Sequence, residues 1–266
     1  MSLDPTDLPI RHHHIRAMLR SPAHYLAVRR DQAEEDPSYA MERGSGLHEL
    51  LAGRRPVLPW EDGRPRRGKD YDAFVAANPE ALILTAADFA LAEAMRAAVM
   101  DDPVAGPLLR AEGANEETIV WSIPGRDLRG RTTPDRRITR PDGSIDVIEI
   151  KTTRNADPER FVWSGRRDYG YHTQAALHAI GAMAKYGTNL WPAPEIRVYI
   201  VAIESTAPHI VSTIRVSPDV LRAGAAEIRE VLDQIAACRD ADAWPGYTPE
   251  VWTWRPDEME AENAEG

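Results

Sequence analysis

A Pro-Asp-Gly turn at 141–143 constrains this chain more than any other sequence feature, because it separates two runs rich in β-branched residues, 131–139 and 145–153. Pro and Asp suit the two central positions of a type I turn, and Gly accepts the left-handed conformation that follows. The pattern therefore predicts a β-hairpin with a three-residue loop, in which Arg140 pairs with Ser144.

The predicted loop also fixes which strand residues face each other. In this register Asp135 lies opposite Glu149 on one face of the sheet, with the two Cβ atoms about 4.5–5.5 Å apart. Side chains alternate along a strand, so Lys151 shares that face while Ile148 and Ile150 are buried on the other. A two-residue turn would put the two acids on opposite faces, so this prediction depends on the loop length.

Two carboxylates beside an ammonium group indicate metal-dependent chemistry on phosphodiesters. Carboxylates this close repel each other unless a hard divalent cation lies between them, and Mg²⁺ commonly combines one or two carboxylates with substrate phosphate. A nearby lysine can orient or deprotonate an attacking water. Asp135, Glu149 and Lys151 are therefore candidate catalytic residues. The alternative is a solvated hairpin with an ordinary acid–lysine pair, because such short patterns also occur by chance.

The composition excludes several classes of protein. The single cysteine, Cys238, excludes a disulfide framework, a four-cysteine zinc site and a four-cysteine iron–sulfur cluster. The sequence shows no signal peptide and no run of about 18 apolar residues, so a cytoplasmic location is expected. No linker divides the 266 residues. We expect one domain over residues 1–256, followed by an acidic, disordered tail at 257–266.

Charge is distributed unevenly along the chain. A net charge of −10 argues against a nucleic-acid partner, but five of the acidic residues lie in the terminal segment 257–266. The basic residues form two clusters that could follow a phosphate backbone, although each could equally be a solvated surface charge. The clusters are Arg54, Arg55, Arg64, Arg66, Arg67 and Lys69, and Arg126, Arg129, Arg131, Arg136, Arg137 and Arg140.

Capping signals and hydrophobic periodicity predict the elements around the hairpin. Ser21-Pro22, Thr85 with Asp88, and Ser217-Pro218 are typical of helix N-termini. We expect helices at 14–20, 22–30, 43–51, 85–100, 171–186 and 218–239, and strands at 116–121, 196–203 and 209–216. Residues 53–70 are predicted to form a loop, and residues 152–170 an irregular segment.

Histidine gives two weaker signals. The consecutive His12, His13 and His14 could bind a metal, but their position favours a short amphipathic helix. His48 lies within the first turns of the helix that begins near Gly44, where small residues permit close backbone approach. A lone histidine on a helix is more often a core or surface residue than a ligand.

Other polar residues can approach the hairpin. A strand at 116–121 can bring a third carboxylate beside Asp135, and the register decides whether Glu116 or Glu117 faces inward. Gln174 and His178 lie one helical turn apart and share a face.

In this order, the motifs resemble those of the PD-(D/E)XK nuclease superfamily and, within it, the exodeoxyribonuclease VIII (RecE-type) phage recombination exonucleases. The resemblance covers roughly residues 14–186. The motifs that carry it are Ser21-Pro22-Ala23-His24-Tyr25, Gly44-Ser45-Gly46-Leu47-His48, Glu116 to Trp121, Pro134-Asp135, Glu149-Ile150-Lys151-Thr152-Thr153 and Tyr171-His172-Thr173-Gln174.

The resemblance implies an α/β (α+β) fold with a restriction-endonuclease-like core, which is a mixed central sheet flanked by helices. It implies that Asp135 and Glu149 are Mg²⁺ ligands and that Lys151 positions or activates water. Gln174 would steady the site or contact substrate. The candidate metal set is His48, Glu116, Asp135, Glu149 and Ile150.

Two positions depart from the family pattern. Thr133 stands where the family commonly has arginine before Pro-Asp, so a basic contact is expected to be missing. His178 stands where an aromatic residue often follows the glutamine. Neither departure removes a carboxylate or the lysine.

The function expected from the resemblance is a Mg²⁺-dependent DNA exonuclease that acts on double-stranded ends in recombination or repair, with Mn²⁺ able to substitute. Cleavage from 5′ to 3′, a ring-shaped homo-oligomer and a single-strand annealing protein as partner are family implications. Alternatives are a structure-specific endonuclease, a nuclease subunit of a larger complex, and a catalytically silent DNA-binding recombination protein. The sequence has no P-loop motif, so it is not itself a helicase.

Overall fold

The computed structural model describes residues 8–30, 39–61, 63–187, 193–248, 250–251 and 253, with side chains in the third helix from residue 45 onward. The expected acidic tail at 257–266 lies outside the described residues. The assignment of a single domain over residues 1–256 stays a prediction. No helix in the described ranges is long and apolar enough to cross a membrane.

A mixed five-stranded sheet forms the centre of the molecule, in the order β3-β6-β7-β8-β9. The pair β7–β8 is parallel, and the other neighbouring pairs are antiparallel. The strands are β3 (Ala114–Asn115), β6 (Arg136–Thr139), β7 (Ile145–Thr153), β8 (Ile196–Glu204) and β9 (Val211–Val216).

The predicted hairpin and its register are confirmed. The backbone N–H of Arg140 donates to the carbonyl of Ser144 at 2.8 Å, and Gly143 has a positive φ of 82°. Arg136 is paired with Ile148, as expected for a three-residue loop. The Pro-Asp-Gly sequence therefore fixes the alignment of β6 and β7, because the loop length sets the register.

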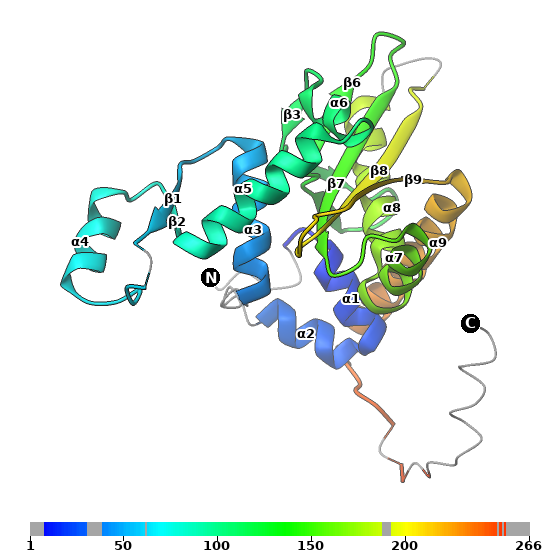
Figure 1. Cartoon of the computed structure of the whole chain (residues 1–266). Coiled ribbons are helices and arrows are strands. Elements are labelled where there is room, and N and C mark those ends of the chain that lie inside the picture. Colours follow the sequence, from blue (N-terminus) through cyan, green and yellow to red (C-terminus); the bar gives the residue numbers. More distant parts are fainter. Residues whose placement is uncertain are drawn as a thin grey trace.

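Helices cover both faces of this sheet, which confirms the expected fold class (Figure 1). The helices are α1 (His12–Arg20), α2 (Pro22–Arg30), α3 (Tyr39–Ala52), α4 (Lys69–Ala77), α5 (Ala86–Asp101), α6 (Ala105–Arg110), α7 (Pro158–Ser164), α8 (Tyr171–Ala182) and α9 (Pro218–Asp240). Two π-helical segments, η2 (Gly165–Tyr169) and η3 (Met183–Gly187), continue α7 and α8.

The alternation of β7 residues decides which helices lie on which face. Ile148 and Ile150 pack with Leu47 of α3 and Met95 of α5. Val147 points to the other face, where it belongs to the cluster formed with α7 and α8. Glu149 and Lys151, which have the same parity as Val147, therefore lie on the face covered by α8.

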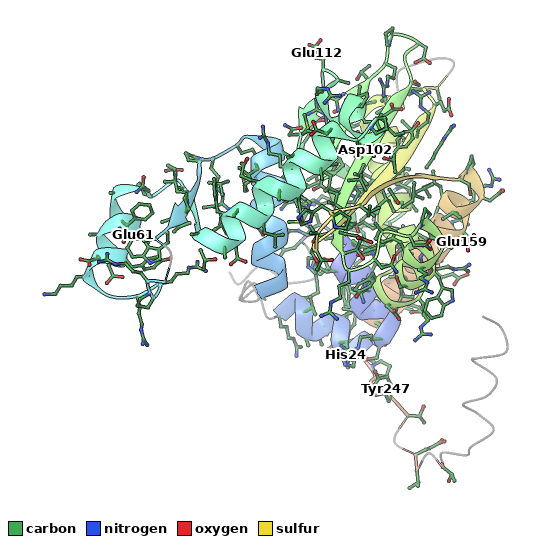
Figure 2. All side chains as sticks on the ribbon, in the orientation of Figure 1. His24, Glu61, Asp102, Glu112, Glu159 and Tyr247 are labelled. Carbon is green, nitrogen blue, oxygen red and sulfur yellow. The ribbon has the colours of Figure 1, made fainter. Side chains whose placement is uncertain are left out.

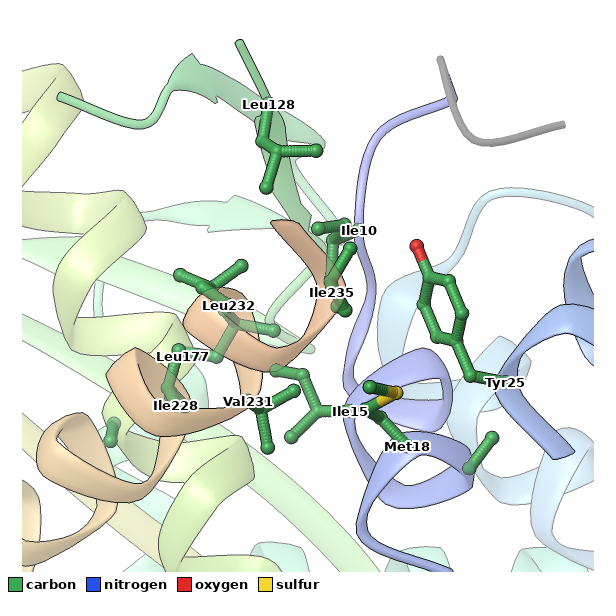
Figure 3. Packing of buried hydrophobic residues seen from close by; sticks show 12 residues of the cluster. Ile10, Ile15, Met18, Tyr25, Leu128, Leu177, Ile228, Val231, Leu232 and Ile235 are labelled. Atoms are coloured by element: carbon green, nitrogen blue, oxygen red, sulfur yellow. The ribbon is translucent and has the colours of Figure 1, made fainter. Parts of the chain in front are cut away.

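A third apolar cluster joins the N-terminal helices to α8 and α9 (Figure 3). Ile15 and Met18 of α1 pack with Val231 of α9, and Tyr25 of α2 stacks on Trp244 with ring centroids 5.4 Å apart. This packing holds α1 against the helix that carries Gln174 and His178.

Two small sheets lie outside the central one. Strands β1 (Val57–Trp60) and β2 (Leu82–Thr85) are parallel and, with α4, project away from the sheet; Glu61 marks this projection in Figure 2. Strands β4 (Ile119–Ser122) and β5 (Arg129–Thr132) form an antiparallel pair.

Several sequence-based boundaries were wrong. Residues 53–70 contain β1 and the start of α4 rather than one loop, because Trp60 is buried against Tyr71 and Phe74 of α4. Residues 152–170 contain α7 and η2 rather than an irregular segment. The signal for α7 was present locally, since Asp157 caps the helix and Pro158 occupies its first turn.

The strand expected at 116–121 begins only at Ile119, because Glu116 has a positive φ of 47° that breaks the extended backbone. The first arm of the hairpin is also interrupted between β5 and β6. The predicted caps of α5 and α9 are confirmed, with the side chains of Thr85 and Ser217 accepting from Asp88 and Val220 backbone N–H groups.

Candidate active site

The interruption of the first hairpin arm positions Asp135. Pro134 has no N–H with which to continue a strand ladder, and β6 begins only at Arg136. One carboxylate oxygen of Asp135 accepts a hydrogen bond from the backbone N–H of Ile150 at 2.6 Å. The backbone carbonyl of Asp135 accepts another from the N–H of Glu116 at 3.0 Å. Asp135 is thus fixed at the end of the β6–β7 ladder, one residue before the first pair.

Three side chains from separate segments converge at this point. His48 comes from α3, Glu116 from the bend between β3 and β4, and Asp135 from the end of the ladder. Nδ1 of His48 lies 3.0 Å from Oδ1 of Asp135, and one ligand atom from each of the three residues lies within 4.8 Å of the others. They line a pocket together with Ile150.

The donor set fits a divalent cation. Carboxylate oxygens suit Mg²⁺ and Mn²⁺, and an imidazole nitrogen is accepted by Mn²⁺ and the later transition metals. Ile150 can contribute only through its backbone, because its hydrocarbon side chain has no donor atom. Its N–H already points at Asp135, and the carbonyl of a strand residue points to the same side as its N–H.

The closeness of the two carboxylates and the histidine changes the pKa values within this cluster. Burial opposes protonation of His48, but the Asp135 carboxylate outweighs it, so the pKa of His48 is raised. Burial and the neighbouring Asp135 raise the pKa of Glu116 against the opposing effect of Arg54. A bound cation would relieve this crowding of negative charge.

Glu149 forms a second group beside the first. Lys151 Nζ and Gln174 Nε2 both donate to Oε1 of Glu149 at 2.6 Å. Nε2 of His178 lies 3.0 Å from Oε2, although the two atoms are not aligned as a hydrogen bond. Burial acts against the charge of Glu149, but Lys151 and His178 outweigh it and lower its pKa.

Lys151 is held as a cation by this arrangement. Burial alone would lower its pKa, but Glu149 and then Asp135 raise it. Its Nζ also lies 5.2 Å from the centre of the Tyr171 ring. The ammonium group therefore contacts the Glu149 carboxylate and is attracted by Asp135, so it can orient a water or a phosphate oxygen.

The structure places the candidate residues in one region, where they form two adjacent groups. His48, Glu116 and Asp135 form the three-residue cluster, whereas the Glu149 carboxylate faces Lys151, Gln174 and His178. The choice between the two glutamates, which the sequence left open, is settled, because Glu117 turns away. Its side chain binds Arg137, Lys185 and Tyr186.

Sequence reasoning missed two contributors. His178 departs from the family pattern, yet it contacts Glu149, and its one-turn spacing from Gln174 is the sequence signal for this contact. Arg54 belongs to the first basic cluster of the sequence. It bridges the nearby Glu49 and Glu116 of a distant segment at 2.5 Å each, and no local pattern predicts the contact with Glu116.

Comparisons with known proteins agree with this fold. A family model described as a PDDEXK-like domain of unknown function (DUF3799) matches residues 12–254. A solved structure from Eubacterium rectale, described as a candidate exonuclease, has the same fold, with a TM-score of 0.64 and 14% sequence identity over 98% of this chain and 95% of that chain.

A second solved structure, that of SSO0001, has a TM-score of only 0.28 and 16% identity, over 47% of this chain and 50% of that chain. That similarity is too weak to support an argument. No match was found among curated proteins.

Proposed function

Because the chain belongs to the family of PDDEXK-like domains described as DUF3799, we propose that it is a divalent-metal-dependent nuclease that hydrolyses phosphodiester bonds in DNA. The observation that carries this proposal is the interaction of Lys151 with two acidic groups. One is the cluster of His48, Glu116 and Asp135, and the other is the carboxylate of Glu149.

Each residue has a role that follows from its contacts. His48, Glu116 and Asp135 would hold the cation, and Glu149, whose charge acts on His48, would join them if its contact with Lys151 is exchanged. A bound divalent cation would polarise the scissile phosphate and neutralise charge on the leaving oxygen. The ammonium group of Lys151 orients the attacking water or a phosphate oxygen.

Gln174 and His178 keep Glu149 in position from the α8 side. Both side chains project from one face of the helix, one turn apart, and reach different oxygens of the same carboxylate. Fixing both oxygens limits the rotation of Glu149 and therefore of the lysine that it holds.

Within this function we favour an exonuclease that acts on double-stranded ends, from 5′ to 3′, as in the RecE-type group that the sequence resembles. The structural neighbour described as a candidate exonuclease supports this choice. A role in phage-type recombination or repair, an annealing-protein partner and a ring-shaped homo-oligomer belong to the same proposal.

The test is to incubate the purified protein with linear duplex labelled at the 5′ or the 3′ end, with Mg²⁺, Mn²⁺ or EDTA. We expect metal-dependent release of nucleotides from linear duplex and none from closed circular duplex. Cleavage of the closed circle would instead indicate an endonuclease. DNA binding without cleavage in any divalent ion would indicate a silent binding protein.

Lys151→Ala is the informative variant. We expect it to fold and to bind DNA but to lose cleavage by at least about a hundredfold, as for the loss of a positioning or proton-transfer group. Lys185→Ala is the matched control, because Lys185 donates to Glu117, which faces away from the cluster. An unimpaired Lys151→Ala enzyme would refute the assigned role of this lysine.

A further inference from the structure

A stack of aromatic rings leads from Lys151 to the surface. Nζ of Lys151 lies 5.2 Å from the ring centre of Tyr171. Tyr171 in turn stacks on Tyr169, with ring centroids 5.3 Å apart and planes 17° apart. Tyr169 is 49% exposed, so the outer end of this stack lies open to solvent beside the proposed active site.

A second exposed ring lies on the same segment. Trp163 of α7 is 53% exposed, and the guanidinium carbon of Arg167 lies 4.5 Å from its ring centre. The exposed Val162 adjoins it. Large aromatic rings that remain in water next to cationic groups mark interaction sites more often than isolated apolar residues do.

The core does not need these outer rings. Phe161, which is buried, anchors α7 by stacking on Tyr171 with ring centroids 5.5 Å apart. Gly165 permits this close packing, because a Cβ there would lie 2.6 Å from the Tyr171 ring. The π-helical turn η2 follows at once, and such turns occur frequently at functional sites.

The surrounding charge is mostly positive, although the whole chain carries −10. Four exposed arginines lie on this segment, and a fifth, Arg16 of the adjoining α1, donates to the carbonyl of Asp168 at 2.7 Å. They are Arg16, Arg154, Arg160, Arg166 and Arg167. Of the three acids on the segment, Asp157 caps α7 and Asp168 contacts Arg167, and the third is Glu159 (labelled in Figure 2).

We propose that the surface of Trp163, Arg167 and Tyr169, here called the aromatic platform, binds a single strand of nucleic acid as it enters or leaves the active site. An exposed ring can stack on an unpaired base, whereas the interior bases of a duplex are already stacked on both faces within the helix. Guanidinium groups beside the rings suit the phosphates of the same strand.

This inference rests on the proposed nuclease function and adds the form of nucleic acid that the site handles. The stack from Tyr169 through Tyr171 to Lys151 gives the direction of the strand toward the lysine. The platform therefore favours a substrate end that is opened before or during hydrolysis over a duplex that remains fully paired.

The test measures binding of a fluorescein-labelled oligothymidylate to the full chain in EDTA, where no metal-dependent cleavage occurs. We expect Trp163→Ala with Tyr169→Ala to weaken binding of the single strand by at least about tenfold, in line with the energy of base–aromatic stacking. Binding of a relaxed, closed circular duplex should change by less than about twofold, because it has neither unpaired bases nor terminal base pairs on which a ring could stack.

Two controls separate stacking from a general loss of structure. Trp163→Phe with Tyr169→Phe keeps both rings and should restore binding. Tyr247→Ala removes a ring that is 72% exposed but lies outside the platform, and should leave binding unchanged (Figure 2). Circular dichroism confirms that each variant is folded.

Unchanged binding of the single strand in the double alanine variant would overturn the proposal and assign this surface to another partner, such as a protein. Equal losses for single strand and duplex would overturn it too. Because the assay contains no divalent ion, it is independent of catalysis. A wild-type protein that binds oligothymidylate through the platform but cleaves no DNA would refute the nuclease proposal alone.

Discussion

The side chain of His178 points its Nε2 at Oε2 of Glu149, 3.0 Å away, and neither buried atom has a hydrogen-bond partner among the described residues. On the other side of the ring, Nδ1 of His178 lies 2.5 Å from the hydroxyl oxygen of Thr132 in β5. The histidine therefore connects a strand outside the central sheet to the carboxylate that holds Lys151.

This relationship predicts that His178→Ala lowers the turnover number by about 10–100-fold, the usual effect of removing a group that orients an active-site carboxylate. His178→Gln can still donate toward Glu149 and should recover part of the loss. Steady-state cleavage kinetics would show a fall in kcat with KM changed little. His172→Ala is the matched control, since His172 lies on the same helix and pairs with Glu227. A fully active His178→Ala enzyme would contradict the prediction.

Metal binding should depend on the three-residue cluster. Asp135→Asn and Glu116→Gln each remove a negative charge from the donor set, so we expect Mn²⁺ affinity to fall at least about tenfold, given that groups beyond the ligands already change affinity by about 10–100-fold. Isothermal titration calorimetry measures this without substrate. Glu117→Gln is the matched control, because Glu117 is turned toward Arg137 and Lys185. This variant should bind Mn²⁺ with the affinity of the wild type. Equal affinities for all variants would place the metal elsewhere.

Arg54 should contribute to stability through the two carboxylates that it joins. Glu49 is only 4% exposed, and without Arg54 its remaining cationic contact among the described residues is Arg55 at 3.2 Å. We expect Arg54→Ala to lower the free energy of unfolding by about 1–2 kcal/mol, since solvent screens the half-exposed guanidinium. Urea denaturation measures the change. Adding Glu49→Gln to the Arg54→Ala variant should reduce this loss of stability, because it neutralises the buried charge that has lost its partner. Arg55→Ala should lower the free energy of unfolding by less than Arg54→Ala does.

The pH dependence of stability should report on His14. Burial, together with the nearby His13 and Arg29, lowers the pKa of His14 from 6.5 to about 3. Its Nδ1 accepts from the backbone N–H of Arg11 at 3.0 Å, which requires the neutral ring. The unfolded chain takes up a proton below pH 6.5 while the folded chain does not. The stabilisation is therefore complete above pH 6.5 and is lost as the pH falls toward 3.

The effect of His14 should lower the free energy of unfolding at pH 5 by about 2 kcal/mol relative to pH 7. His14→Asn keeps an acceptor near the same place but has no proton to gain, so its stability should fall less between these two pH values. Urea unfolding of both proteins at pH 7 and pH 5 makes the comparison. Identical pH profiles would show that His14 does not govern the acid sensitivity.

Local sequence determined the parts of the fold that depend on neighbouring residues. The Pro-Asp-Gly turn at 141–143 set the register of β6 and β7, because a loop of that length and chemistry allows one alignment. Ser217 and Thr85 marked the starts of helices through their side-chain caps. The parity of β7 placed Glu149 and Lys151 on one face, since side chains alternate along any strand.

Only the tertiary structure decided how these residues are used. His48 and Glu116 reach Asp135 because α3 packs on one face of the sheet and the backbone turns at Glu116. Glu149 meets Gln174 and His178 because α8 packs on the other face. These contacts depend on the packing of segments that are far apart in sequence. The energy of that packing is a sum over many apolar contacts between whole faces, so no short motif determines it.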